Sequence, residues 1–174
     1  MNLEKYQQYS RIARGLEEAE LVLKDARIVN VFTEEIIRGD IAIQDGIIAG
    51  IGSFHGKEER DLASKYVCPG FIDSHLHLES TLVTPAELVT VASRHGTTTF
   101  IVDPHESANV SGLAGIDYIL EQTEAVKANV YVMMPSCVPA TSIDDNGCTL
   151  TAADMAPYLD NSRILGLGEV MDSI

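Results

Sequence analysis

The sequence is poor in the residues that mark several classes of protein. Its 174 residues contain no tryptophan, only 6% of them are aromatic, and cysteine occurs three times. Cys68, Cys137 and Cys148 form no CxxC pair, and their odd number argues against a disulfide framework. The absence of such a framework makes a reducing cytoplasm the expected setting.

Basic residues and long apolar runs are also scarce. Lysine and arginine number 12 against 26 acidic residues, which leaves a formal net charge of -14. Because nothing resembles a basic patch that would neutralise phosphates, nucleic acid is not an expected partner. No apolar run approaches the ~20 residues of a membrane span, and the first 20 residues lack the apolar core of a secretory signal. The sequence therefore predicts no association with a membrane.

The first third of the chain combines a helical and a β pattern. Apolar residues at helical spacing predict an amphipathic helix at the N-terminus, so residues 1–19 are assigned to a helical segment. Residues 20–66 are rich in Val, Ile and Leu, and Asp45-Gly46 is typical of a tight hairpin turn between two strands. We expect a small antiparallel β unit here, with residues 53–65 as its polar exit.

From Tyr66 onward, strand patterns alternate with helix patterns. The expected strands cover 66–73, 97–103, 130–135 and 163–170, and the expected helices cover 84–95, 116–126 and 151–159. Such alternation is typical of right-handed βαβ units in a parallel sheet. The fold class is therefore α/β, with about four βα units in residues 67–174, either as a short open sheet or as the front portion of a longer protein.

Polar side chains gather where these strands end, which is where parallel α/β folds place function. The residues concerned are His75, His77 and Glu79 in "PGFIDSHLHLES", then Asp103, His105 and Glu106, then Ser136 and Cys137, and finally Glu169. A mixture of imidazole and carboxylate suits a metal ion, and a period of two puts His75 and His77 on one side of a strand. Alternatively, the two histidines only share a strand face, and His105 and Glu106 only cap a loop.

Several motifs resemble one known family. "PGFIDSHLHLES" resembles the first metal-binding strand of the amidohydrolase superfamily, and "DPHESAN", "MMPSCVPAT" and "GLGEVMD" are similar to its adenine deaminase family. The resemblance implies a (β/α)8 TIM barrel, with residues 67–174 as its first half and residues 20–66 as the N-terminal part of a small β-sandwich. It also implies adenine as the substrate, and we expect the protein to be a cytoplasmic homo-oligomer.

The resemblance further implies a divalent metal centre and roles for its surroundings. His75, His77 and Glu169 would be metal ligands, with Glu169 bridging a binuclear pair of Mn²⁺ or Fe²⁺, or of Zn²⁺. Glu169, His105 and Glu106 would serve catalysis, and Glu79, His105 and Ser136 would bind substrate. Hydroxide generated at the metal would attack C6 of adenine, and hypoxanthine and ammonia would form.

Two features of the sequence leave other readings open. The family's two later histidine ligands and its late aspartate have no counterpart before Ile174, so we expect this chain to be a partial enzyme, inactive alone. The loop "TSIDDNGCTL" also departs from the family pattern. The alternatives are another amidohydrolase acting on a cyclic amide, or a non-catalytic fragment that associates with itself.

Overall fold

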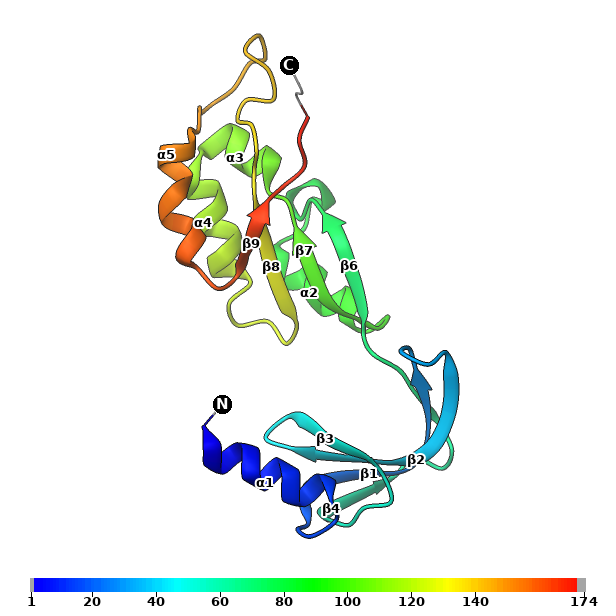
Figure 1. Cartoon of the computed structure of the whole chain (residues 1–174). Coiled ribbons are helices and arrows are strands. Elements are labelled where there is room, and N and C mark those ends of the chain that lie inside the picture. Colours follow the sequence, from blue (N-terminus) through cyan, green and yellow to red (C-terminus); the bar gives the residue numbers. More distant parts are fainter. Residues whose placement is uncertain (1, 172–174) are drawn as a thin grey trace. The chain divides into compact units, whose positions relative to one another are not determined.

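The computed structural model describes residues 2–171, which divide into two compact units after Pro69. The first unit is a mixed sheet with one helix, and the second is a parallel sheet with helices (Figure 1). Within the described residues, no helix combines the length and apolar character needed to span a membrane. The α/β class predicted from the sequence is confirmed.

The described residues of the first unit, 2–69, form one helix and five strands. Its elements are α1 (Leu3–Ala13), β1 (Ala19–Asn30), β2 (Glu35–Gln44), β3 (Ile47–Gly52), β4 (Gly56–Asp61) and β5 (Tyr66–Val67). Asp45 and Gly46 both have positive φ, the geometry of the two-residue hairpin turn that their sequence predicted between β2 and β3. The core of this unit includes Ile12, Val22 and Ala42.

Three predictions for the first unit need correction. The helix ends at Ala13, because Gly15 at φ 69° leaves the helical conformation, so residues 14–18 are not helical. The polar segment at residues 53–65 contains β4, whose exposed side chains give no apolar alternation. The sheet is not purely antiparallel, because β1 pairs with β4 and β5 in parallel as well as with β2 in antiparallel fashion.

The second unit has a four-stranded parallel sheet in the order β6-β7-β8-β9. Its strands are β6 (Phe71–Leu76), β7 (Thr97–Val102), β8 (Asn129–Met134) and β9 (Ile164–Leu167). Its helical elements are η1 (Glu79–Thr81), α2 (Pro85–Ser93), α3 (His105–Ser111), α4 (Leu113–Gln122), α5 (Ala152–Met155) and η2 (Ala156–Asp160). The predicted alternation of strand and helix is confirmed.

One face of this sheet carries the core. Phe100, Val132 and Ile164 from the strands pack with Val89 of α2 and Ile116 of α4. Side chains on alternate positions point to the other face, where Leu165 and Leu167 are more than half exposed. The sheet is thus covered by helices on one side and presents apolar side chains on the other.

Some predicted boundaries shift in the second unit. The expected strand over 66–73 is interrupted at Cys68–Gly70, so Tyr66–Val67 pairs with β1 and Phe71 begins β6. Pro69 has no backbone N–H to offer a ladder, which favours a break there. The expected helix over 151–159 is one short α-helix followed by the 3-10 helix η2. Thr84 caps α2 as predicted, since its side chain accepts a hydrogen bond from the Glu87 N–H.

Candidate metal centre

Two histidines lie together where β6 ends. The pairing of β6 with β7 reaches Leu76, the last residue of β6. His75 is therefore the last residue but one of the strand, and His77 is the first residue after it. Their Nε2 atoms lie 3.2 Å apart, and the rings meet edge to face with centroids 5.0 Å apart. The period of two along the strand therefore brings both imidazoles to one place, as the sequence predicted.

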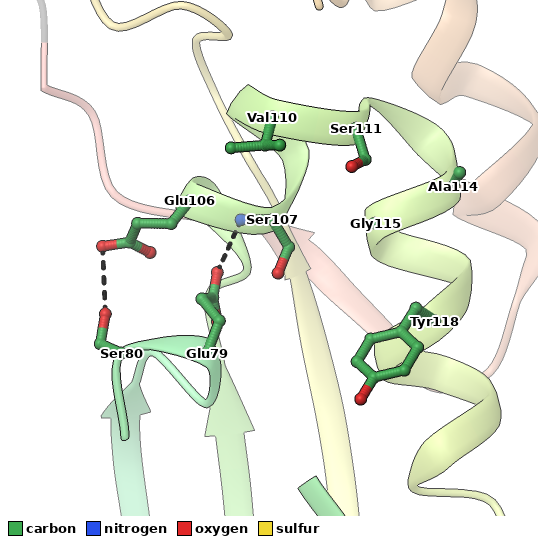
Figure 2. A pocket seen from close by; sticks show the side chains of 9 residues that line it. All are labelled: Glu79, Ser80, Glu106, Ser107, Val110, Ser111, Ala114, Gly115 and Tyr118. Carbon is green, nitrogen blue, oxygen red and sulfur yellow. Dashed lines mark hydrogen bonds between the residues drawn. The ribbon is translucent and has the colours of Figure 1, made fainter. Parts of the chain in front are cut away.

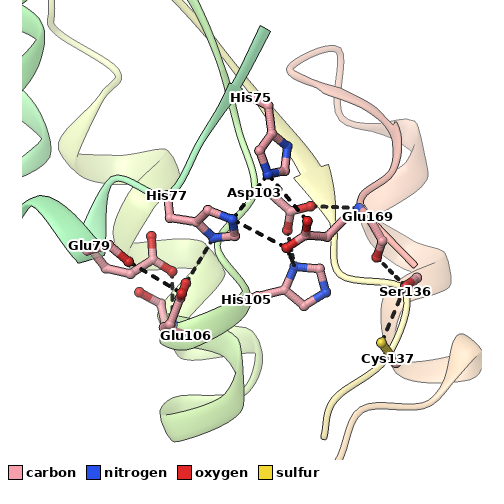
Figure 3. Close-up of polar contacts among 11 residues, drawn as sticks. His75, His77, Glu79, Asp103, His105, Glu106, Ser136, Cys137 and Glu169 are labelled. Atoms are coloured by element: carbon pink, nitrogen blue, oxygen red, sulfur yellow. Dashed lines mark hydrogen bonds and ion pairs between the residues drawn. The ribbon is translucent and has the colours of Figure 1, made fainter. Parts of the chain in front are cut away.

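Glu169 reaches the same place from the other edge of the sheet. It follows β9 by two residues, and the Gly168 N–H donates a hydrogen bond to the Met134 carbonyl 2.6 Å away. The Glu169 carboxylate places Oε2 3.5 Å from His75 Nε2 and Oε1 3.3 Å from His77 Nε2. Figure 3 shows this carboxylate between the two imidazoles and His105.

The three side chains have the spacing of ligands around one small cation. Their ligand atoms all lie within 4.8 Å of one another. Ligands held at about 2.0–2.1 Å in tetrahedral geometry are separated by roughly 3.3 Å, close to the three distances observed here. Two neutral imidazoles and a carboxylate are a donor set that divalent transition metals accept. The residues present therefore fit a divalent ion.

Glu106 contacts the far side of His77. It lies in the first turn of α3, and its Oε2 is 2.9 Å from His77 Nδ1, while Ser80 Oγ donates a hydrogen bond to Oε1 at 3.3 Å. Burial opposes ionisation of Glu106, but its own backbone N–H and its contact with His77 hold its pKa below the ordinary value. A proton on His77 Nδ1 satisfies this carboxylate and leaves the Nε2 lone pair directed at the candidate centre.

Asp103 and His105 form a buried pair behind Glu169. Asp103 is fully buried and His105 is 5% exposed, and Asp103 Oδ1 lies 2.5 Å from His105 Nδ1. Burial would raise the pKa of Asp103, but the close contact with His105 and the hydrogen bond from the Glu169 N–H keep it below the ordinary value. Burial would lower the pKa of His105, but Asp103 raises it above the ordinary value. His105 Nδ1 is 3.8 Å from Glu169 Oε1, so this pair adjoins the candidate ligands.

Glu79 and Ser136 make backbone contacts. One oxygen of Glu79 accepts a hydrogen bond from the Ser107 N–H at 3.0 Å, and burial raises the pKa of this carboxyl above the ordinary value. Ser136 Oγ donates a hydrogen bond to the Glu169 carbonyl at 2.5 Å. Both side chains help to hold neighbouring segments, and their predicted role in binding substrate stays a prediction.

Two cavities adjoin these residues. The first, of about 510 Å³, lies beside η1, α3 and α4 (Figure 2). It is lined by two carboxylates together with small, apolar and hydroxyl-bearing residues: Glu79, Ser80, Glu106, Ser107, Val110, Ser111, Ala114, Gly115 and Tyr118. The second, of about 490 Å³, contains His77, His105 and Glu169 together with Asp144 and Asp145. The loop over 141–150 therefore borders the cavity that opens onto the candidate ligands.

Sequence reasoning missed one contributor to this arrangement. His75, His77, Glu169, His105 and Glu106 were all candidates, and the structure brings them together. The sequence places Asp103 at the end of a strand, but it gives this residue no role. Its position before Pro104 reads as a turn signal, and only the folded chain shows its contact with the Glu169 N–H.

Comparisons with known proteins bear on the family and the fold of the chain. The model of the amidohydrolase family matches residues 66–165. Adenine deaminases from Desulfitobacterium hafniense and Clostridium acetobutylicum are 61% and 54% identical over 160 residues, covering 92% of this chain and 28% of each relative. The structure of atrazine chlorohydrolase from Arthrobacter aurescens, complexed with zinc, aligns with a TM-score of 0.65 at 14% identity, covering 88% of this chain and 48% of that one.

The comparisons carry different weight. The structural likeness shows a shared fold alone, because the identity is low. The adenine deaminases confirm the resemblance predicted from the motifs, and the chain spans 28% of the length of these two relatives. The family model covers more than half of the chain and includes His75, His77, Asp103, His105 and Glu106. The chain therefore belongs to the amidohydrolase family.

Proposed function

We propose that His75, His77 and Glu169 hold a divalent cation in an enzyme that hydrolyses adenine to hypoxanthine and ammonia. The observation that carries this proposal is the convergence of two imidazole Nε2 atoms and one carboxylate at distances of 3.2–3.5 Å. The similarity to adenine deaminases supports the choice of substrate. A cation bound there would lower the pKa of a water molecule, so that hydroxide is available near neutral pH.

The surrounding residues have chemistry that suits this reaction. His105 lines the same cavity as Glu169, and the Asp103 carboxylate behind it lies against His105 Nδ1, which supports a proton on that nitrogen. A protonated imidazole at this position can donate a proton to the departing amino group of adenine. Glu106 holds His77 from outside, and the cavity of about 490 Å³ has room for a purine base.

The same proposal includes the complete fold and the identity of the metal. The exposed apolar face of the β6–β9 sheet supports a partial TIM barrel, in which further strands would cover Leu165 and Leu167. Imidazole and carboxylate ligands accept Mn²⁺, Fe²⁺ or Zn²⁺, and zinc occurs in the chlorohydrolase neighbour. A binuclear centre bridged by Glu169, a cytoplasmic setting and a homo-oligomer remain part of the proposal.

The relatives are much longer than this chain, so we would test the proposed substrate, adenine, in a chimera of full length. Residues 1–174 would replace the aligned segment of the adenine deaminase from Desulfitobacterium hafniense, and adenine loss would be followed by ultraviolet absorbance. We expect the chimera to deaminate adenine and its Glu169→Gln and His77→Asn variants to lose at least about 100-fold in rate. The 174-residue chain alone is expected to be inactive.

Controls separate this function from its alternatives. The chimera with Glu58→Gln, an exposed carboxylate in the first unit paired with Arg60, should retain the rate of the unaltered chimera. A folded chimera that leaves adenine intact would contradict the proposal. Opening of a hydantoin or dihydroorotate ring by that chimera would favour the cyclic-amide alternative, for which the divergent loop over 141–150 at the cavity is the supporting observation.

A further inference from the structure

We propose that Asp103 is the positioning residue of this centre, which ties the histidine-bearing end of β6 to the Glu169-bearing end of β9. This inference rests on the proposed function for its consequence, but its structural part stands on contacts of Asp103 alone. No sequence motif assigned it a role. Three groups of Asp103 make contacts, and each contact restrains a different part of the candidate centre.

The backbone of Asp103 holds the histidine segment. Its N–H donates a hydrogen bond to the Leu76 carbonyl at 2.9 Å, and Leu76 is the residue between the two histidines. This bond extends the pairing of β6 with β7 by one step beyond Leu76 and Val102. The backbone that carries both imidazoles is therefore fixed on the Asp103 side.

One carboxylate oxygen of Asp103 holds the glutamate segment. Asp103 Oδ2 accepts a hydrogen bond from the Glu169 N–H at 2.8 Å. Asp103 follows β7 and Glu169 follows β9, and β8 lies between these strands, so the carboxylate spans the end of β8. The pairing of β8 with β9 ends at Leu167, and this bond takes the place of a ladder contact for Glu169.

Gly168 leaves the space that this contact requires. A Cβ atom on Gly168 would lie 2.1 Å from Asp103 Oδ2, which is far inside van der Waals distance. The absence of a side chain at this position lets the buried carboxylate approach the Glu169 amide. The close approach and the complete burial of Asp103 indicate a rigid connection between the two strand ends.

The other carboxylate oxygen restrains His105. Oδ1 of Asp103 lies 2.5 Å from His105 Nδ1, and His105 borders the cavity beside Glu169. One buried side chain thus contacts both the backbone of a candidate ligand and a candidate proton donor. Such outer partners of metal ligands set ligand orientation, and their loss typically weakens metal binding by about 10–100-fold.

Hydrogen exchange of the Glu169 amide tests the structural part without metal. In the 174-residue chain, followed by nuclear magnetic resonance, we expect Asp103→Ala to speed exchange at Glu169 by about tenfold or more, because the acceptor is lost. Asp103→Asn keeps an acceptor oxygen and should retain most of the protection. Exchange of the β7 and β8 amides reports whether each variant remains folded.

Zinc titration tests the consequence for the centre. Zn²⁺ is the probe because it binds nitrogen and oxygen sites more tightly than Mn²⁺ or Fe²⁺. Binding that the His77→Asn variant removes is counted as binding at this site, which excludes zinc held by the three cysteines. We expect Asp103→Ala to weaken this binding by about 10–100-fold and Asp103→Asn to restore most of it.

Asp40 provides a matched control in the other unit. It is also a buried aspartate, and its oxygens accept hydrogen bonds from the Asp25 and Phe54 N–H groups. Asp40→Asn should leave both the Glu169 exchange rate and the zinc affinity unchanged. Should Asp103→Ala fail to fold, Asp103→Ser, whose hydroxyl is too short to replace the carboxylate, takes its place in both measurements.

The outcomes separate this inference from the proposed function. Unchanged Glu169 exchange in a folded Asp103→Ala or Asp103→Ser variant would overturn the positioning role. Faster exchange with unchanged zinc affinity would overturn its link to the centre. A wild-type chain with no His77-dependent zinc binding would contradict the proposed function, and the exchange comparison would still decide whether Asp103 holds Glu169.

Discussion

His77 is held from both sides: Nδ1 lies 2.9 Å from Glu106 Oε2, and Nε2 lies 3.2 Å from His75 Nε2. The contact with Glu106 selects the tautomer that carries its proton on Nδ1, which leaves Nε2 as the ligand atom. The two nitrogens of one ring therefore have separate tasks, and the task of one depends on a carboxylate from another element.

Glu106→Ala, which removes the carboxylate, should weaken metal binding more than Glu106→Gln, which only removes its charge. Glu106→Ala leaves His77 free to turn and to change tautomer, and we expect the zinc dissociation constant to rise by about 10–100-fold. Glu106→Gln retains an oxygen that accepts from Nδ1–H and should lose less. Calorimetric titration of the 174-residue chain measures both, with Glu58→Ala as a surface control. Equal affinity in Glu106→Ala and wild type would show that Glu106 does not orient His77.

The acid stability of the first unit should depend on Asp40. Burial would raise the pKa of this carboxyl, but Lys24 Nζ at 2.5 Å and the N–H groups of Asp25 and Phe54 hold it below the ordinary value. A folded-state pKa below the unfolded value stabilises the fold above the unfolded pKa of about 3.9, and this contribution is lost as pH falls through the folded pKa.

The measurement is denaturant unfolding of the first unit between pH 2 and pH 7. We expect Asp40→Asn to lower the free energy of unfolding at pH 7 by about 2 kcal/mol and to flatten its dependence on pH in the acid range. Asp45→Asn, which removes a solvent-screened surface pair with Lys5, should leave this free energy close to the wild-type value. If the free energy of unfolding of Asp40→Asn fell with acid as steeply as that of wild type, the acid dependence would come from other carboxylates.

The residues that were predictable from the sequence are those whose position depends on local pattern. His75 and His77 share a face because strands have a period of two, and Glu169 follows a strand with a clear apolar run. The hairpin at Asp45-Gly46 was also predictable, because few pairs of residues readily adopt positive φ at two successive positions. Each of these features is decided within about ten residues of chain.

Features that depend on distant partners were not predictable. The segment Gly56–Asp61 is a strand only because β1 pairs with it, since its own side chains are polar and exposed. Asp103 contacts Glu169 across 66 positions of sequence and across the end of β8. No spacing rule relates two strand ends that are not neighbours in the sheet, so the partner of a buried aspartate is found only from the fold.

The uncovered sheet face should drive self-association of the chain. Leu165 and Leu167 on β9 are 51% and 60% exposed, although they lie on the sheet. Apolar patches of this kind associate in water. Sedimentation velocity should show oligomers for the wild-type chain and a shift to monomer for Leu165→Lys/Leu167→Lys. Ile143→Lys, at an exposed loop position, is the control and should change nothing. A strictly monomeric wild-type chain would count against the self-associating alternative.

Gly168→Ala should disturb the centre without removing any of its polar groups. The added methyl would lie 2.1 Å from Asp103 Oδ2, so either the carboxylate or the end of β9 must move. We expect a loss of about 1–3 kcal/mol in the stability of the second unit, the usual cost of overpacking. We also expect weaker zinc binding, because Glu169 follows the displaced residue.

Thermal unfolding and zinc titration measure the two effects. Gly52→Ala, whose Cβ would meet its nearest neighbour at an ordinary 3.4 Å, is the matched control. If Gly168→Ala kept wild-type zinc affinity while losing stability, the close approach to Asp103 would serve packing alone.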